Sequence, residues 1–332
     1  MGRLKPLMVR QPRIFWRKNY IFALALALLL ALPFIFTARF QHHVMIKVLM
    51  FAFLGCAWNI IGGYTGQVAL GHAAFFGIGA YTSAMLYTEA GFPFWTSVPL
   101  AAVVAGIVGA LLGVPCLRVR DDFLAITTMG INFVVEAIFL YIPFFGGAMG
   151  IGGINLPKWF GREMTKPEYF FLILVVFVFF LLLDRQLGRS WIGLAWASIR
   201  EDEQAAGAMG VDVVRFKVLA FILGSAIAGL AGGFYAHFLT FIMPQNFGFG
   251  QSIVILSMVV FGGIGTRWGP IAGAIILGVL PEISRPIMEY RTLIYGVLLL
   301  GMMRFQPGGL LGPESILSKT FQRTIYRLVS PE

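Results

Sequence analysis

Charged side chains are scarce in this sequence. Of its 332 residues, 12% are charged and 58% are hydrophobic, whereas about 25% of the residues of a soluble protein carry charge. One soluble core of this length has no room for so much apolar surface, so the composition indicates lipid as the solvent. We therefore expect an all-α fold, a polytopic bundle of membrane-spanning helices.

The residues of common reactive centres are also scarce. Two cysteines and four histidines occur, which excludes a disulfide framework and offers no spacing typical of a metal site. No lysine follows a glycine, so the phosphate-binding P-loop is missing. A Gly-x-Ser-x-Gly nucleophile motif is missing too. We expect a chain that is not an enzyme and that binds no metal or cofactor itself.

The net charge of +10 comes largely from basic residues that flank apolar runs, six of them before residue 19. This placement orients a membrane protein and is not typical of a nucleic-acid surface. With both termini cytoplasmic and ten spans, 18 of the 25 Lys and Arg residues lie inside. Eight or nine spans remain compatible with the pattern. The candidate spans are 20–38, 44–62, 68–88, 92–117, 123–142, 169–183, 218–243 and 247–266, with the weaker 268–281 and 290–305.

These spans divide the chain into three parts. A basic cytoplasmic tail, residues 1–19, precedes a transmembrane domain, residues 20–305, and a cytoplasmic tail, residues 306–332, follows it. Two loops of the domain are long: 143–168 on the periplasmic side and 184–217 on the cytoplasmic side. No separate soluble domain is expected.

Residues 62–81, "GGYTGQVALGHAAFFGIGAY", interrupt an apolar run with Tyr64, Thr65, Gln67 and His72. Backbone freed by glycine at membrane depth must be buried in protein or line a wet cavity. The stretch therefore predicts a discontinuous or tightly packed segment. Its polar side chains either line a route through the membrane or bridge helices.

Asn132 and Glu136 lie four residues apart within an apolar span, so they share one helix face. A carboxylate at that depth is costly and should face the protein interior or water. Glu136 either lines the same route or donates, protonated, to another helix.

Glycines at four-residue spacing, Gly265, Gly269 and Gly273, predict close helix packing. A short internal echo also occurs, because "IGGYTGQ" at 61–67 resembles "FGGIGTR" at 261–267. Chance explains this echo as well as a repeat does.

The cytoplasmic loop contains "SIREDEQAAGAMGVD", residues 198–212. Ser198 and Glu201 have capping-box spacing, and Asp202 is an alternative cap. Acidic Glu201, Asp202 and Glu203 suit a helix start. Gly210 suits its end in a left-handed turn. We expect a short helix, containing Ala205 and Ala206, that either docks on another protein or only connects two spans.

Four stretches in order carry a family resemblance: 63–81, 198–212, "GGIGTRWGPIAGA" at 262–274 and "YGVLLLGMMRFQPGGLLG" at 295–312. The chain resembles the longer permease subunit of branched-chain amino acid ABC importers. The resemblance implies a multi-pass protein of the bacterial inner membrane that works by alternating access. It implies that partner ATPase subunits use the ATP and dock on the coupling residues Glu201, Asp202, Glu203, Ala205, Ala206 and Gly210.

The same resemblance implies a sister permease, as a heterodimer or a homodimer, and a periplasmic substrate-binding protein, within membrane lipid. The substrate pathway would include Tyr64, Thr65, Gln67, His72, Asn132 and Glu136. Permeases for urea and short amides are closely similar and stay an alternative. A stand-alone channel or secondary transporter is the other alternative.

Overall fold

The protein is built almost entirely from helices. The computed structural model describes residues 38–116, 121–159, 161–283, 290–306 and 308–312. The tail 1–19, the candidate span 20–38 except its last residue and most of the tail 306–332 lie outside these residues. The elements are α2 (Arg39–Trp58), η1 (Asn59–Tyr64), α3 (His72–Thr88), α4 (Phe94–Cys116), α5 (Asp121–Tyr141), η2 (Pro143–Phe145), η3 (Gly147–Met149), β1 (Lys158–Trp159), β2 (Arg162–Glu163), α6 (Lys166–Leu187), α7 (Trp191–Glu201), α8 (Glu203–Ala208), α9 (Val213–Leu239), η4 (Pro244–Phe247), α10 (Phe249–Gly262), α11 (Gly269–Ile283) and α12 (Arg291–Phe305).

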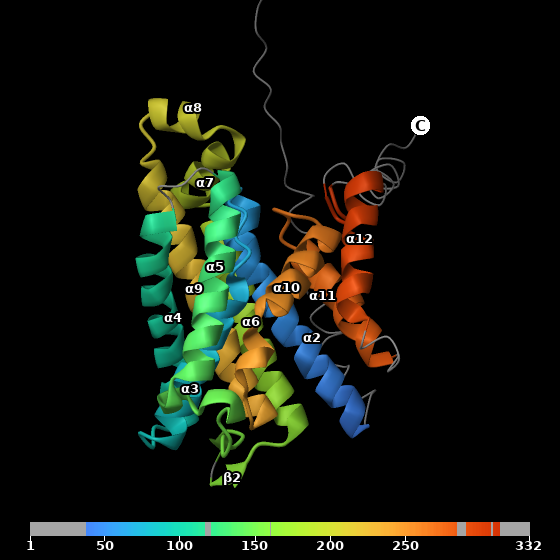
Figure 1. The fold of residues 1–332 in the computed structure, drawn as a ribbon. Helices are drawn as coiled ribbons and strands as arrows, with labels where there is room; N and C mark the ends of the chain where they lie inside the picture. The colour runs from blue at the N-terminus through green and yellow to red at the C-terminus, as the bar shows by residue number, and fades with distance from the viewer. Residues whose placement is uncertain (1–37, 117–120, 160, 284–289, 307, 313–332) are drawn as a thin grey trace, which may run out of the picture.

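The long helices run between two ends of the bundle (Figure 1). Helices α7 and α8 cover one end, and the β1–β2 hairpin lies at the other. Helix α6 connects the hairpin end to α7, and α9 returns from α8 to the hairpin end, where Ile242 pairs with Ile151. The predicted loops 184–217 and 143–168 thus lie at opposite ends.

Within the described residues, six helical segments are long and apolar enough to cross a membrane: Phe40–Tyr64, Phe94–Val114, Phe123–Tyr141, Lys166–Leu187, Val213–Leu239 and Pro244–Gly262. They match six of the ten predicted spans. The predicted span 68–88 forms α3, whose 17 residues begin only at His72. The two weak spans correspond to the shorter apolar helices Gly269–Leu280 and Leu293–Met302. The all-α expectation is therefore met.

Helix α9 packs along α3 and α4, and small residues make the contact close. A Cβ at Gly79 of α3 would collide with the backbone of Gly229, and one at Gly232 with the carbonyl oxygen of Phe76. The outer face of α4 is different, because Val103, Ile107 and Leu111 are exposed and apolar. Such a face suits contact with lipid or with another membrane subunit.

The predicted glycine packing holds for two of its three residues. A Cβ at Gly273 of α11 would collide with the Met258 carbonyl of α10, and one at Gly269 with the carbonyl oxygen of Gly263 directly after α10, so these glycines let the two helices meet. Gly265 does not share their helix face, contrary to the prediction. It lies in the loop before α11 with φ +74°, a conformation that glycine adopts without strain.

Candidate functional site

The predicted interruption at 62–81 is a change of helix type followed by irregular backbone. Helix α2 continues into the π-helix η1, which contains Gly62 and Gly63, and seven residues, 65–71, separate the end of η1 from the start of α3. Single π-helical turns are frequent at functional sites. The candidate site therefore centres on this bend.

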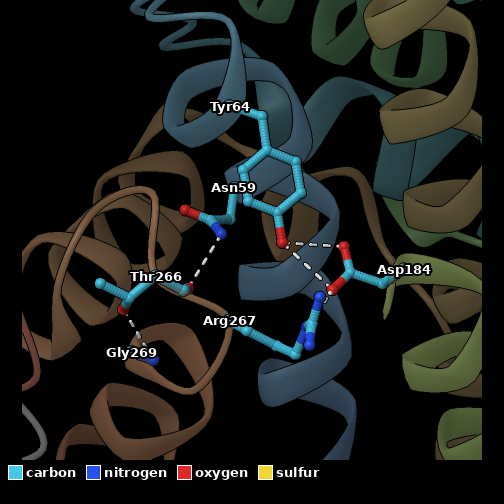
Figure 2. A network of polar contacts seen from close by, with 6 residues as sticks. All are labelled: Asn59, Tyr64, Asp184, Thr266, Arg267 and Gly269. Carbon is cyan, nitrogen blue, oxygen red and sulfur yellow. Dashed lines mark hydrogen bonds and ion pairs between the residues drawn. The ribbon is translucent and has the colours of Figure 1, made fainter. Parts of the chain in front are cut away.

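Tyr64, the last residue of η1, joins two helices through a buried carboxylate (Figure 2). Its hydroxyl donates to Asp184 Oδ1 and Oδ2 at 2.9 and 3.1 Å. Arg267 Nε donates to Asp184 Oδ2 at 3.1 Å. Asp184 lies near the end of α6 and is 5% exposed, so these two donors replace the water that the carboxylate would otherwise bind.

Asn59, the first residue of η1, binds the loop before α11 (Figure 2). Its Nδ2 donates to the carbonyl oxygen of Thr266 at 3.1 Å, and its Oδ1 accepts from the Gly265 amide at 2.8 Å. A Cβ at Gly63 would be 2.8 Å from the amide nitrogen of Gly265, so the two stretches of the internal echo, 61–67 and 261–267, lie against each other. The same loop carries Arg267, to which Tyr64 is linked through Asp184, so both ends of η1 are connected to it.

Helix α7 is attached directly to the bend. Arg200 Nη1 donates to the carbonyl oxygen of Gly63 at 2.6 Å. The Trp196 ring stacks on Tyr64, with centroids 6.4 Å apart, and is fully buried. We call Asn59, Tyr64, Asp184, Arg200, Thr266 and Arg267 the bend network. This network links the α7–α8 end to both glycine-rich segments.

Thr65 and Gln67 pair with each other just after the bend. Thr65 Oγ1 donates to the carbonyl oxygen of Ile61 at 2.6 Å and accepts from Gln67 Nε2 at 2.7 Å. Both side chains are buried, and Gln67 Oε1 has no hydrogen-bond partner among the described residues. This pair bridges the turn of the chain rather than two helices.

A second polar group lies in the middle of the bundle. Asn132 Nδ2 donates to the carbonyl oxygen of Phe247 in η4 at 3.2 Å, and its Oδ1 accepts from Ser252 Oγ at 3.1 Å. Ser252 in turn accepts from the Ala73 amide at 2.9 Å. Neighbouring His72 is buried, and neither ring nitrogen has a partner within the described part of the chain. Asn132 thus fixes η4 against α3 and α5.

Glu136 lies beside this second group, as the shared helix face predicts. A Cβ at Gly248 would be 3.0 Å from both of its carboxylate oxygens. The candidate pathway residues therefore fall into two clusters. Tyr64, Thr65 and Gln67 lie at the bend, and Asn132 and Glu136 lie at η4.

Helix α8 has the predicted start and end. Asp202 is the N-cap, because its Oδ1 accepts from the Ala205 amide at 2.9 Å, and Gly210 follows with φ +90°. The capping-box alternative with Ser198 is wrong, because Ser198 lies inside α7 and its hydroxyl donates to the carbonyl oxygen of Ala195. Glu203 forms an ion pair with Lys217 of α9 at 2.5 Å.

The predicted coupling residues differ in exposure. Ala206 is 5% exposed and packs inside the chain, whereas Glu201, Asp202, Ala205 and Gly210 are exposed. Met209, which the sequence reading did not select, is 85% exposed beside them. The outward face of this end thus carries acidic and small residues around one large apolar side chain.

Most members of the bend network were not predicted from the sequence. Arg200 and Arg267 entered only as charges that orient the spans, and Asn59 and Asp184 were not selected; nor was Trp196, which stacks on Tyr64. The usable signal was the position of Asp184, an acid directly after an apolar run. Among residues 38–116, 121–159, 161–283, 290–306 and 308–312, no group of three metal-binding side chains occurs.

Comparison with known proteins identifies relatives of this chain. The chain is similar to the permease protein LivM of a high-affinity branched-chain amino acid transport system of Salmonella typhimurium, with 34% identity over 89% of this chain and 75% of the relative. It is similar to LivH of the same organism, a permease protein of a system with the same description, with 26% identity over 80% of this chain and 92% of LivH.

The chain is also similar to a permease protein of a different transport system. The L-arabinose transport system permease protein AraH of Escherichia coli is 28% identical over 54% of this chain and 56% of its own length. No solved structure matches the chain significantly. The family described as "Branched-chain amino acid transport system / permease component" matches residues 42–303. The chain therefore belongs to this family of transport permeases.

Proposed function

We propose that this chain is one permease subunit of a binding-protein-dependent ABC importer that carries branched-chain amino acids across the bacterial inner membrane. The proposal includes ten membrane spans and places both termini in the cytoplasm. In this orientation α7 and α8 face the cytoplasm, and the β1–β2 hairpin faces the periplasm. The excess of Lys and Arg on the α7–α8 side supports this orientation.

The observation that carries the proposal is the attachment of α7 to the bend network. A permease driven by separate ATPase subunits needs an exposed element that they can move and a rigid link from it to the pathway. Helix α8 and Met209 supply the exposed element. Arg200 and Trp196 supply the link, because both contact η1.

The proposed mechanism follows from this link. ATP binding to the partner subunits moves α8 and α7, and Arg200 and Trp196 pass the displacement to η1. Because η1 binds the Gly265–Arg267 loop, both glycine-rich segments shift together. ATP thereby favours one of two arrangements of the helices, which is alternating access. The chain itself binds no cofactor, and the partners use the ATP.

Within this mechanism the two polar clusters have different roles. Tyr64, Thr65 and Gln67 hold the bend, which we place at the cytoplasmic end of the pathway. His72, Asn132 and Glu136 lie deeper, near η4, where a substrate would pass. A periplasmic binding protein delivers that substrate at the hairpin end.

The second pathway half is a sister permease. The similarity to both LivM and LivH supports a heterodimer of two related chains. Exposed apolar residues on α4 and α5 offer surface for that partner and for lipid. Co-expression of differently tagged copies tests this point, because a homodimer would purify with both tags.

Uptake by the reconstituted complex tests the function. Proteoliposomes that contain both permeases and both ATPases are expected to take up radiolabelled leucine only when ATP and the binding protein are present. Urea and L-arabinose serve as comparison substrates, the latter because AraH is a relative. Leucine uptake by this chain alone, without ATP, would support the channel reading instead.

The docking role of α8 has a matched control within the chain. Met209 and Met149 are equally exposed, at 85%, but Met209 follows α8 whereas Met149 lies in η3, in the loop that precedes the β1–β2 hairpin. Met209→Glu is expected to lower the amount of ATPase that purifies with the permease, because a charge would enter an apolar contact. Met149→Glu should leave it unchanged. Equal ATPase recovery with both variants would contradict docking on α8.

A further inference from the structure

Glu136 of α5 is an acidic residue inside a membrane-spanning segment. It belongs to the apolar segment Phe123–Tyr141, and five residues, 137–141, separate it from the end of α5, a rise of about 8 Å. Within the part of the chain that the structure describes, its carboxylate has no hydrogen-bond partner and no Lys, Arg or His pairs with it. The expectation that Glu136 donates to another helix therefore finds no acceptor there.

The carboxylate lies at the start of α10. A Cβ at Gly248, the N-cap of that helix, would be 3.0 Å from both carboxylate oxygens. The N-terminus of a helix carries about half of one positive charge, so it balances a carboxylate in part and leaves negative charge for a cation. The site is thus short of one positive group.

One side of Glu136 is open. The side chain is half-buried, whereas Val135 and Phe139 beside it are buried. Hydrocarbon is a poor solvent for a carboxylate, and an acidic residue within a span faces the protein interior or water. The open side of Glu136 therefore faces a water-filled route or another subunit.

Aromatic rings surround this carboxylate. Four phenylalanines flank it in sequence and in space: Phe133 and Phe139, three residues before and after Glu136 on α5, and Phe247 and Phe249, on either side of Gly248. The Phe133 and Phe249 rings are 5.6 Å apart. The Tyr81 ring of α3 stacks on Phe139 at 4.0 Å and lies edge-on to Phe247 at 5.8 Å. The faces of such rings attract cations, and the rings also suit an apolar group.

Two further polar side chains of this region have no partner. The Tyr81 hydroxyl and both ring nitrogens of His72 are buried without a hydrogen bond to any described residue. Ala73, next to His72, is connected through Ser252 to Asn132, one turn before Glu136. A hydroxyl oxygen and a neutral imidazole nitrogen both accept hydrogen bonds. Buried polar groups of this kind destabilise a protein unless a ligand or water satisfies them.

We infer that Glu136 binds the α-ammonium group of the transported amino acid, and that the rings around it contact the apolar side chain. The inference rests on the proposed function, because it assigns a site to that substrate. An ammonium group supplies both the positive charge and the N–H donors that this region lacks. Urea and L-arabinose carry no positive charge and cannot form this ion pair. Glu136 is therefore a specificity-determining residue for amino acids.

Removal of the charge tests the inference in the complete reconstituted transporter, with the same binding protein throughout. Glu136→Gln keeps the size of the side chain. Uptake of radiolabelled leucine is expected to fall about tenfold or more, since a hydrogen bond between charged groups is lost. Glu136→Asp keeps the charge and should transport better than Glu136→Gln.

A competition experiment separates contact with substrate from a structural role. Isoamylamine has an ammonium group and an apolar chain like that of leucine but no carboxylate, and it should inhibit leucine uptake by the wild type. Half-inhibition of the remaining uptake of Glu136→Gln should need about tenfold more isoamylamine. Isocaproate, which has the carboxylate and no ammonium group, should inhibit both complexes equally. Because the binding protein is the same, a difference belongs to the permease.

Controls separate binding from assembly. Glu89→Gln removes an exposed acidic residue at the end of α3 and should transport as the wild type does. The amounts of sister permease and ATPase that purify with each variant should stay unchanged.

The outcomes are distinct. Leucine uptake by Glu136→Gln within twofold of the wild type overturns the inference and leaves the proposed function intact. Lower uptake with unchanged isoamylamine inhibition, or with loss of the sister permease, assigns Glu136 a structural or interface role and also overturns it. So does a wild-type complex that isoamylamine does not inhibit. If the wild-type complex takes up no leucine, the proposed function fails and this inference fails with it.

Discussion

The bend network and the group around Asn132 are both polar regions inside an apolar bundle, but they differ in completeness. In the bend network, buried Asp184 has two donors and Asn59 uses both ends of its amide. Beside Asn132, neither ring nitrogen of buried His72 has a hydrogen-bond partner within the described residues. A fully satisfied network rigidifies a protein, whereas a buried polar group without a protein partner needs a ligand, a water molecule or strain to account for it.

Breaking the ion pair of the bend network should have the largest effect on stability. Arg267→Met leaves the buried Asp184 carboxylate with Tyr64 alone, which should cost about 2–4 kcal/mol. We expect the lower end of this energy range, because the Arg267 side chain is 32% exposed and exposed ion pairs contribute less to stability. Thermal unfolding of the purified complex measures this change.

Two further variants sharpen that result. The double variant Asp184→Leu with Arg267→Met should recover much of the loss, because it removes both charges. Arg162→Ala breaks an exposed ion pair with Glu168 and should leave the unfolding temperature unchanged. A double variant less stable than Arg267→Met would contradict the assignment of this pair as a coupled unit.

Substitution of the loop glycine should have an intermediate effect. Gly265→Ala puts a side chain at φ +74° and against the guanidinium of Arg200, so it should destabilise the complex by about 1–3 kcal/mol. It should also reduce the leucine uptake obtained per ATP hydrolysed, since α7 would be pushed away from η1. Gly130→Ala is the control, because a Cβ there meets nothing within 4 Å. Full coupling in Gly265→Ala would argue against α7 as the link.

Loosening η4 should have the smallest effect on stability and a larger effect on transport. Ser252→Ala removes one donor to Asn132 and should cost about 1 kcal/mol. Because Asn132 holds η4 beside the proposed substrate route, the KM for leucine should rise while the amount of assembled complex stays constant. An unchanged KM would place Asn132 outside the substrate route.

The sequence was informative where a structural signal was local. Asp202 and Gly210 delimit α8 through contacts within a few residues, so their types predict its start and end. The glycines and polar residues of 62–71 likewise predict an interrupted helix. Asn132 and Glu136 were assigned to one face from their spacing, and both do lie beside η4.

The same reading failed where partners are distant in the chain. Asp184 bonds to Tyr64 across 120 residues and to Arg267 across 83, which no local pattern encodes. Gly265 was grouped with Gly269 and Gly273 by spacing, but the chain turns between them.

The long separation within the bend network has a consequence for biosynthesis. Asn59 and the Thr266 carbonyl that it binds are 207 residues apart. At about 5–20 residues per second, a ribosome adds that length in ~10–40 s. During this time the Asn59 and Tyr64 side chains lie in the nascent chain without the loop that completes their network. Closure of the bend therefore waits until α10 has been made, and a chain that stops earlier presents unsatisfied polar groups to cellular proteases.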